Sequence, residues 1–134
     1  MSPVQRPISG TTLTLTLADE MRVVREQLKP ASRIARTLVK NGALRATLIG
    51  LAPGGRLAPH STDGPITVQV LEGEIEFEAD GQRHALVAGS LIALGANVVH
   101  GAHSTRGGML LLTVAASSGS GDTATARPHP PGQE

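Results

Sequence analysis

The sequence contains no cysteine, tryptophan or tyrosine, and Phe77 is its single phenylalanine. Without cysteine there can be no disulfide bond or thiolate metal site, so a metal ion would need histidine, carboxylate or water ligands. Nucleic-acid bases and sugar rings are usually bound by stacking on aromatic side chains. The scarcity of aromatic rings therefore argues against that kind of recognition.

Net charge and long apolar runs are also scarce. The 12 basic and 11 acidic residues give a formal net charge of +1, which predicts no surface for neutralising a row of phosphates. No stretch approaches the roughly 20 apolar residues of a membrane span, and the N-terminus lacks the apolar core of a secretory signal. We therefore expect a cytoplasmic protein that binds neither nucleic acid nor a membrane.

The chain has the length of a single domain with loose ends. Its 134 residues are enough to bury most of the apolar surface in one core. Residues 117–134 are rich in Ser, Gly, Thr and Pro and have no apolar periodicity, which predicts a disordered tail in which His129 has no role. Residues 1–10 are predicted to be flexible. The folded domain is thus expected over residues 11–116.

One amphipathic helix is expected near the start of the domain, at about residues 17–28. Apolar residues recur there at helical spacing: Leu17, Met21, Val24 and Leu28. Thr16 and Asp19 match a capping box, and Pro30 marks the end of the helical pattern.

The remainder of the domain has the pattern of short strands. Asn41 and Gly42 separate two apolar runs and supply the residue pair that a tight hairpin turn favours. Further on, Ile75 and Phe77 alternate with glutamates, so one face of that strand should be buried. More short apolar runs follow at even spacing, with turn residues between them that include Glu72-Gly73. This pattern predicts an all-β sandwich or barrel.

Two stretches, Pro53–Phe77 and Ala88–Ser104, resemble the two sequence motifs of the cupins. The resemblance covers about Arg33–Ala115 and is to small single-domain cupins of the RmlC-like, conserved-barrel type. It implies a double-stranded β-helix, which is a small jelly-roll barrel, together with the one short N-terminal helix. It also implies a homodimer. Dimerisation could pair the backbone of an edge strand that would otherwise be exposed.

The resemblance implies a degenerate metal motif. His60 matches the first histidine of the first motif, whereas Thr62 and Ile66 stand where the second histidine and the glutamate are usual. His100 matches the histidine of the second motif, and Ser104 stands where an asparagine often follows. His60 and His100 are therefore the predicted metal ligands. Two imidazoles hold a divalent ion such as zinc, iron, nickel or manganese only loosely.

Three further residues are candidates for a replacement ligand: Gln69, Asp63 and His103. Side chains alternate across a strand, so Gln69 should face outward if Ile66 faces inward, and His103 should face away if His100 faces inward. A bulge can shift this register. We expect His84 and His103 to be solvated side chains.

Arg45 and Thr47 lie on one face of a predicted strand. If that face lines the barrel interior, Arg45 could hold a carboxylate or phosphate ligand through paired hydrogen bonds. The alternative, which the rarity of buried unpaired arginines favours, is an arginine on the outer face or in a dimer contact.

Three functions remain open at this point. The first is a small-molecule-binding barrel without chemistry, favoured by the lost ligands and by an interior of Val, Leu, Ile and Thr. The second is a metal-dependent dioxygenase or isomerase that acts on a small molecule. The third is a metal-free isomerase or epimerase in which a histidine acts as a general base. Fold membership does not choose among them.

Overall fold

The computed structural model describes residues 12–115. The predicted flexible N-terminus of residues 1–10 and the predicted tail of residues 117–134, with His129, lie outside the described residues. A helix is followed by eight strands, which run in the order α1 Leu17–Gln27, β1 Arg33–Asn41, β2 Leu44–Leu51, β3 Arg56–His60, β4 Ile66–Ala79, β5 Gln82–Val87, β6 Leu91–Leu94, β7 His100–His103 and β8 Gly108–Ala115.

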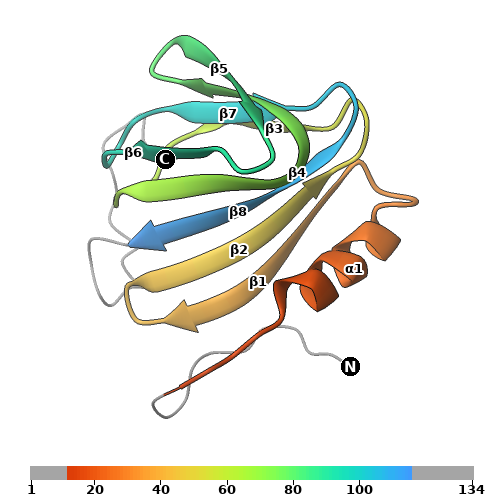
Figure 1. Cartoon of the computed structure of the whole chain (residues 1–134). Helices are drawn as coiled ribbons and strands as arrows, with labels where there is room; N and C mark the ends of the chain where they lie inside the picture. Colours follow the sequence, from red (N-terminus) through yellow and green to blue (C-terminus); the bar gives the residue numbers. More distant parts are fainter. Residues whose placement is uncertain (1–11, 116–134) are drawn as a thin grey trace.

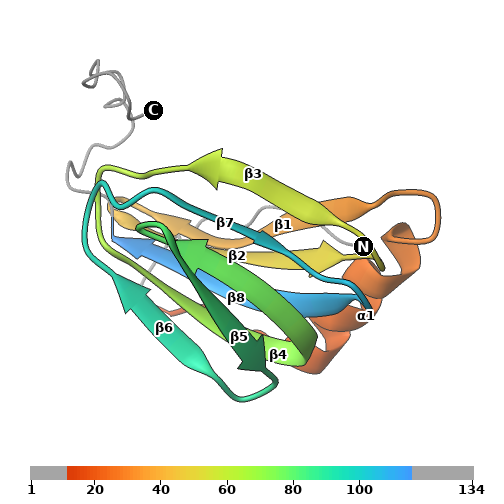
Figure 2. The ribbon, with the colours of Figure 1, turned by 90° about the horizontal axis from the view of Figure 1, so that it is seen from above.

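The strands form a curled antiparallel sheet in the order β1-β2-β8-β4-β7-β3, and β5 and β6 also pair with β4 (Figures 1 and 2). One layer contains β1, β2, β8, β6 and the first half of β4. The other layer contains β3, β7, β5 and the second half of β4. The prediction of an all-β barrel with one short N-terminal helix is confirmed.

Strand β4 joins the two layers, and its course shows that one predicted turn is wrong. Glu72-Gly73 was expected to be a turn between two strands, but the chain continues as one strand of 14 residues that bends at this point. Gly73 has a φ angle of 77°, and the register to β8 shifts between Val70 and Glu72. A bulge of this kind lets a strand leave one layer and enter the other.

Strand β3 was absent from the strands expected on periodicity. Its sequence, RLAPH, has one half-buried residue and four exposed ones, so it lacks the alternating apolar pattern that marks a strand. Its pairing with β7 defines it instead.

The main core lies between the two layers. The buried residues of the first half of β4 are Ile66, Val68 and Val70, and those of its second half are Ile75, Phe77 and Ala79. Side chains from β2, β7 and β8 complete this core: Ile49, Leu51, Ala102 and Leu110. The inner faces of the strands are therefore largely aliphatic.

A second core lies between α1 and the outer face of β1, β2 and β8. Its buried members are Val24, Leu38, Leu48 and Met109. Gly50 allows the helix to approach closely, because a Cβ atom there would lie 2.6 Å from Cγ1 of Val24. Thr16 is the N-cap residue as predicted, but its side chain makes no capping hydrogen bond. Within residues 12–115, no helix has the length and apolar character that crossing a membrane would require.

Candidate functional site

The two predicted histidines lie at the same end of the barrel. β3 ends at His60 and β7 begins at His100, and these two residues are direct partners in the β3–β7 pairing. On its other side, His100 pairs with Ala79 at the end of β4. The loops beside them are joined by a hydrogen bond from the amide of Asn97 to the carbonyl oxygen of Thr62, 2.8 Å long.

The imidazole rings of His60 and His100 are in contact. Their centroids are 4.5 Å apart and their planes are inclined by 61°. His100 is 5% exposed, whereas His60 is an exposed residue, so only one of the two predicted ligands lies in the interior of the barrel. The strand that carries His60, β3, lies at the edge of its layer, and the exposed His60 ring lies against the buried ring of His100.

Both rings are oriented by the same backbone contact. Nδ1 of His60 lies 3.0 Å from the carbonyl oxygen of Ala58, and Nδ1 of His100 lies 3.0 Å from that of Val98. A carbonyl oxygen only accepts a hydrogen bond, so each Nδ1 carries a proton and donates. In the neutral rings, each Nε2 is therefore left with a free lone pair. Histidines that bind metals usually have this arrangement.

Nε2 of His100 is the atom without a partner. It is buried and makes no hydrogen bond within the described residues. Burial lowers the pKa of the His100 imidazole below its ordinary value of 6.5; the hydrogen bond to Val98 opposes this effect and the nearby His60 adds to it. His100 is thus neutral at pH 7, with an acceptor lone pair that nothing in the described chain satisfies.

The other two positions of the metal motif supply no strong ligand. Ile66 is 3% exposed and belongs to the main core. Thr62 is half-buried, and its hydroxyl donates a 2.9 Å hydrogen bond to the carbonyl oxygen of Gly64. Within residues 12–115 there is no group of three or more His, Asp, Glu or Cys side chains that could hold a metal ion.

Two of the candidate replacement ligands lie away from the pair. Gln69 is exposed between the buried Val68 and Val70, on the outer face of β4 as parity predicted. His103 faces away from the core, and its Nε2 lies 3.8 Å from Oε1 of Glu76. The third candidate, Asp63, is half-buried in the loop after β3.

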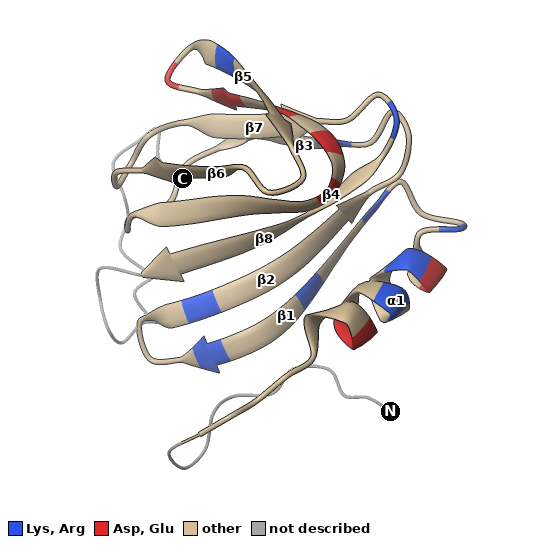
Figure 3. Cartoon of the chain, in the orientation of Figure 1, with Lys and Arg blue, Asp and Glu red and all other residues tan. Residues whose placement is uncertain are grey.

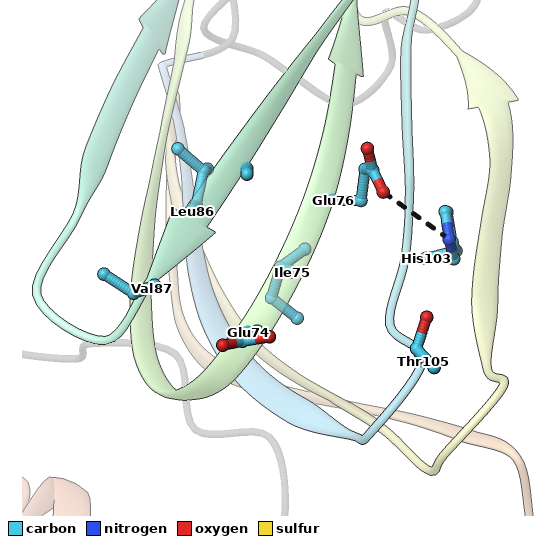
Figure 4. Close-up of a pocket in the computed structure, with 8 residues that line it drawn as sticks. Glu74, Ile75, Glu76, Leu86, Val87, His103 and Thr105 are labelled. Atoms are coloured by element: carbon cyan, nitrogen blue, oxygen red, sulfur yellow. Dashed lines mark ion pairs between the residues drawn. The ribbon is translucent and has the colours of Figure 1, made fainter.

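His103 lines a separate pocket of about 170 Å³ on the outside of the barrel, where its ring points toward Glu76 (Figure 4). The pocket lies between β4, β5 and the end of β7, and is lined by Glu74, Ile75, Glu76, Ala85, Leu86, Val87, His103 and Thr105. His84 was expected on a solvated face, but it is half-buried opposite Phe77.

Arg45 lies on the inner face of β2. It shares this face with Ile49 and Leu51 of the main core, and its cross-strand partner on β8 is Val114, which packs against that core. The outer-face alternative is therefore wrong. Nε of Arg45 is buried and makes no hydrogen bond within the described part of the chain.

The sequence analysis missed one contact of the site and one structural role outside it. Phe77 stacks on His100, with ring centroids 5.8 Å apart and planes 15° from parallel. Ser104, which aligned with a motif position, has a structural role at the opposite end of β7. Its hydroxyl donates to the carbonyl oxygen of Glu74 at 2.6 Å and accepts from the amide of Gly107 at 2.9 Å. The sequence held one indication of the Phe77 contact: Phe77 is the single phenylalanine and lies on the predicted buried face of its strand.

Comparison with known proteins places this chain in a family. A search of curated proteins gave no match. Among solved structures, an RmlC-like cupin from Shewanella frigidimarina NCIMB 400 is 27% identical, covers 69% of this chain and 81% of its own, and has a TM-score of 0.61.

Two further structures are similar in fold alone. KdgF from Halomonas sp. is 19% identical over 66% of this chain and 82% of its own, with a TM-score of 0.57. Salicylate 1,2-dioxygenase from Pseudoaminobacter salicylatoxidans, solved with gentisate, is 20% identical with a TM-score of 0.69. That match covers 85% of this chain and 38% of the dioxygenase.

The family model described as the cupin domain matches residues 47–115, just over half of the chain. The matched segment begins in β2 and ends with β8, so it includes both histidines and the whole of β4. The chain therefore belongs to the cupin family.

Proposed function

We propose that this protein binds a small molecule at the His60–His100 pair, with a loosely held divalent metal ion as the point of attachment. The observation that carries the proposal is the buried Nε2 of His100, which has no partner among residues 12–115 and lies in a ring in contact with His60. Leaving such an acceptor unsatisfied is costly, so a ligand atom or ion that occupies this position gains affinity.

The two histidines supply some, but not all, of the ligands that a divalent ion needs. When the rings are neutral, the two Nε2 atoms carry the free lone pairs, because both Nδ1 atoms donate to backbone carbonyls. With Ile66 and Thr62 in the other motif positions, the remaining coordination positions fall to water or to the bound molecule. A divalent ion held in this way would polarise an oxygen donor of that molecule. Zinc, iron, nickel and manganese are the candidates.

The test is a metal titration of chelator-treated full-length protein, read by the side-chain nitrogen resonances of its histidines. Nickel and zinc serve as probes. We expect one ion per chain to shift the Nε2 resonances of His60 and His100, and His100→Ala to weaken the affinity by at least about tenfold.

His103→Ala is the matched control, because this histidine lies in the separate pocket beside Glu76. It should leave the metal affinity unchanged. An absence of saturable shifts at His60 and His100, or an equal loss of affinity in His103→Ala, would remove the metal from the proposal.

Two catalytic alternatives use the same residues. A metal-dependent dioxygenase or isomerase would need the ion for turnover. In a metal-free isomerase or epimerase, Nε2 of His100 would accept a proton from the bound molecule. Turnover that survives complete removal of metal favours the second alternative, and turnover that returns only with added metal favours the first.

We also infer a homodimer. β1 ends the strand order of its layer, so its outer backbone edge has no partner strand among residues 12–115. Light scattering on the purified protein would test this, with a mass of one chain as the contradicting result. A cytoplasmic location stays a prediction.

A further inference from the structure

Arg45 is a second polar group on the inner face of the barrel that lacks a partner. The Arg45 side chain is half-buried and its Nε atom is buried, yet Nε makes no hydrogen bond within the described residues. No ion pair joins Arg45 to any residue of the 12–115 range. An arginine always carries its charge, and a buried N–H without an acceptor costs free energy. An acceptor from outside that range would remove this cost.

The strand register places Arg45 at the same end of the barrel as the histidine pair. Arg45 is paired with Val114, and Val114 is paired on its other side with Ile66. Ile66 starts β4 only a short loop after His60. Adjacent strands lie about 4.8 Å apart, so the Cα atoms of Arg45 and Ile66 are separated by roughly 10 Å across the sheet.

The surroundings of Arg45 on β1, β2 and β8 carry positive charge but no negative charge. Lys40 is its direct cross-strand partner on β1, so two cations face the same side of the sheet. β1, β2 and β8 contain no Asp or Glu, and Figure 3 shows blue bands on β1 and β2 and no red ones on any of the three strands. Asp63 lies in the loop at this end, yet it forms no ion pair with Arg45 or Lys40 in the described structure.

We propose that Arg45 binds a carboxylate group of the small molecule, and hence that the ligand is a carboxylic acid. The anion site at Arg45 is independent of the proposed function. Only the assignment of its carboxylate to the molecule bound at His60 and His100 rests on that function. A guanidinium presents Nε and one terminal nitrogen side by side, which matches the two oxygens of a carboxylate.

A carboxylate suits this site better than a phosphate. The inner face around Arg45 is largely aliphatic, with Val114 beside it and Ile66 and Leu112 further along the sheet; Thr47 is the polar residue next to it on the same face. Moving a dianion into such surroundings costs more desolvation energy than moving a singly charged group. Lys40 is exposed, so solvent screens its charge and it offsets little of this desolvation cost.

The test follows the Nε–H resonance of Arg45 by NMR in full-length, metal-free protein. Acetate and inorganic phosphate are the two probes, with ionic strength held constant by sodium chloride. We expect a saturable shift of the Arg45 resonance with acetate, at an affinity at least several times higher than for phosphate. A saturable response to phosphate alone would overturn the carboxylate assignment, and no response to either would overturn the anion site.

Three variants separate this proposal from the function of the histidine pair. Arg45→Gln should reduce acetate affinity by at least about tenfold, followed on neighbouring backbone amides, while the metal affinity stays unchanged. His100→Ala should do the reverse. Arg83→Gln, at an exposed arginine of β5, should change neither. A melting curve for each variant verifies folding, and acetate binding that survives Arg45→Gln in folded protein would contradict the proposal.

Discussion

The imidazole of His100 stacks on the phenyl ring of Phe77, the only phenylalanine of the protein. The contact gives His100 a rigid apolar support on one side, while the ring of His60 lies against it at 4.5 Å between centroids. Nδ1 is held by the carbonyl oxygen of Val98. Nε2 is therefore the one ring nitrogen of His100 that can contact a ligand or ion.

Stability should fall in acid because of His100. Its pKa is lowered in the folded protein by burial, from an ordinary value of 6.5. Between that lowered pKa and 6.5 the unfolded chain binds more protons, so the free energy of unfolding of metal-free protein rises with pH in this window. The contribution is complete above 6.5 and is lost as the pH falls through the folded-state value.

Urea unfolding of metal-free protein over this pH range would measure the effect. His100→Gln should show a smaller loss of stability in acid than the unmodified protein, and His103→Gln should show the same loss. An equal loss in His100→Gln would mean that burial of His100 does not govern the acid response.

Gly73→Ala should destabilise the barrel by at least about 2 kcal/mol. Gly73 has a φ angle of 77°, and an added Cβ would meet the carbonyl oxygen of Gly107 at the bend of β4. Gly81→Ala is the control, since Gly81 has a φ of 83° with nothing within 4 Å of the added atom. It should cost about 1 kcal/mol by chemical denaturation. Equal costs would show that crowding at the bend is unimportant.

Glu20→Gln should loosen α1 from the sheet. Oε1 of Glu20 accepts a 2.7 Å hydrogen bond from Nε of Arg36, and the two side chains are 14% and 13% exposed. Removing one charge leaves the other poorly hydrated, at a cost of roughly 1–3 kcal/mol. The double replacement Glu20→Met and Arg36→Met should recover most of this loss.

The exposed pair between Asp19 and Arg22 is the matched comparison on the same helix. Asp19→Asn should change the free energy of unfolding by no more than about 0.5 kcal/mol, since solvent screens this pair. If Asp19→Asn cost as much as Glu20→Gln, burial would not explain the difference.

Arg45→Met should leave the stability of the ligand-free protein unchanged or raise it by up to about 1 kcal/mol. The substitution removes a buried N–H without a partner and keeps the aliphatic part of the side chain. Thermal unfolding in chloride buffer measures this, with the exposed Arg83→Met as the reference. A loss above 1 kcal/mol would indicate that Arg45 has a stabilising contact within the protein.

Local sequence patterns were sufficient for the fold class. The helical spacing before Pro30 and the period of two after it depend only on neighbouring residues, and they predicted the helix and most strands. The resemblance to the two cupin motifs singled out His60 and His100, forty positions apart. Parity along β4 also predicted that Gln69 faces outward.

Only the tertiary structure decided how these residues meet. The bend in β4, the polar strand β3 and the inner position of Arg45 all depend on which strands pair and in what register, and that pairing joins residues distant in sequence. The same holds for the exposure of His60 and the stacking of His100 on Phe77. Periodicity assigns a side chain to one of two faces, whereas the curl of the whole sheet determines which face becomes the interior.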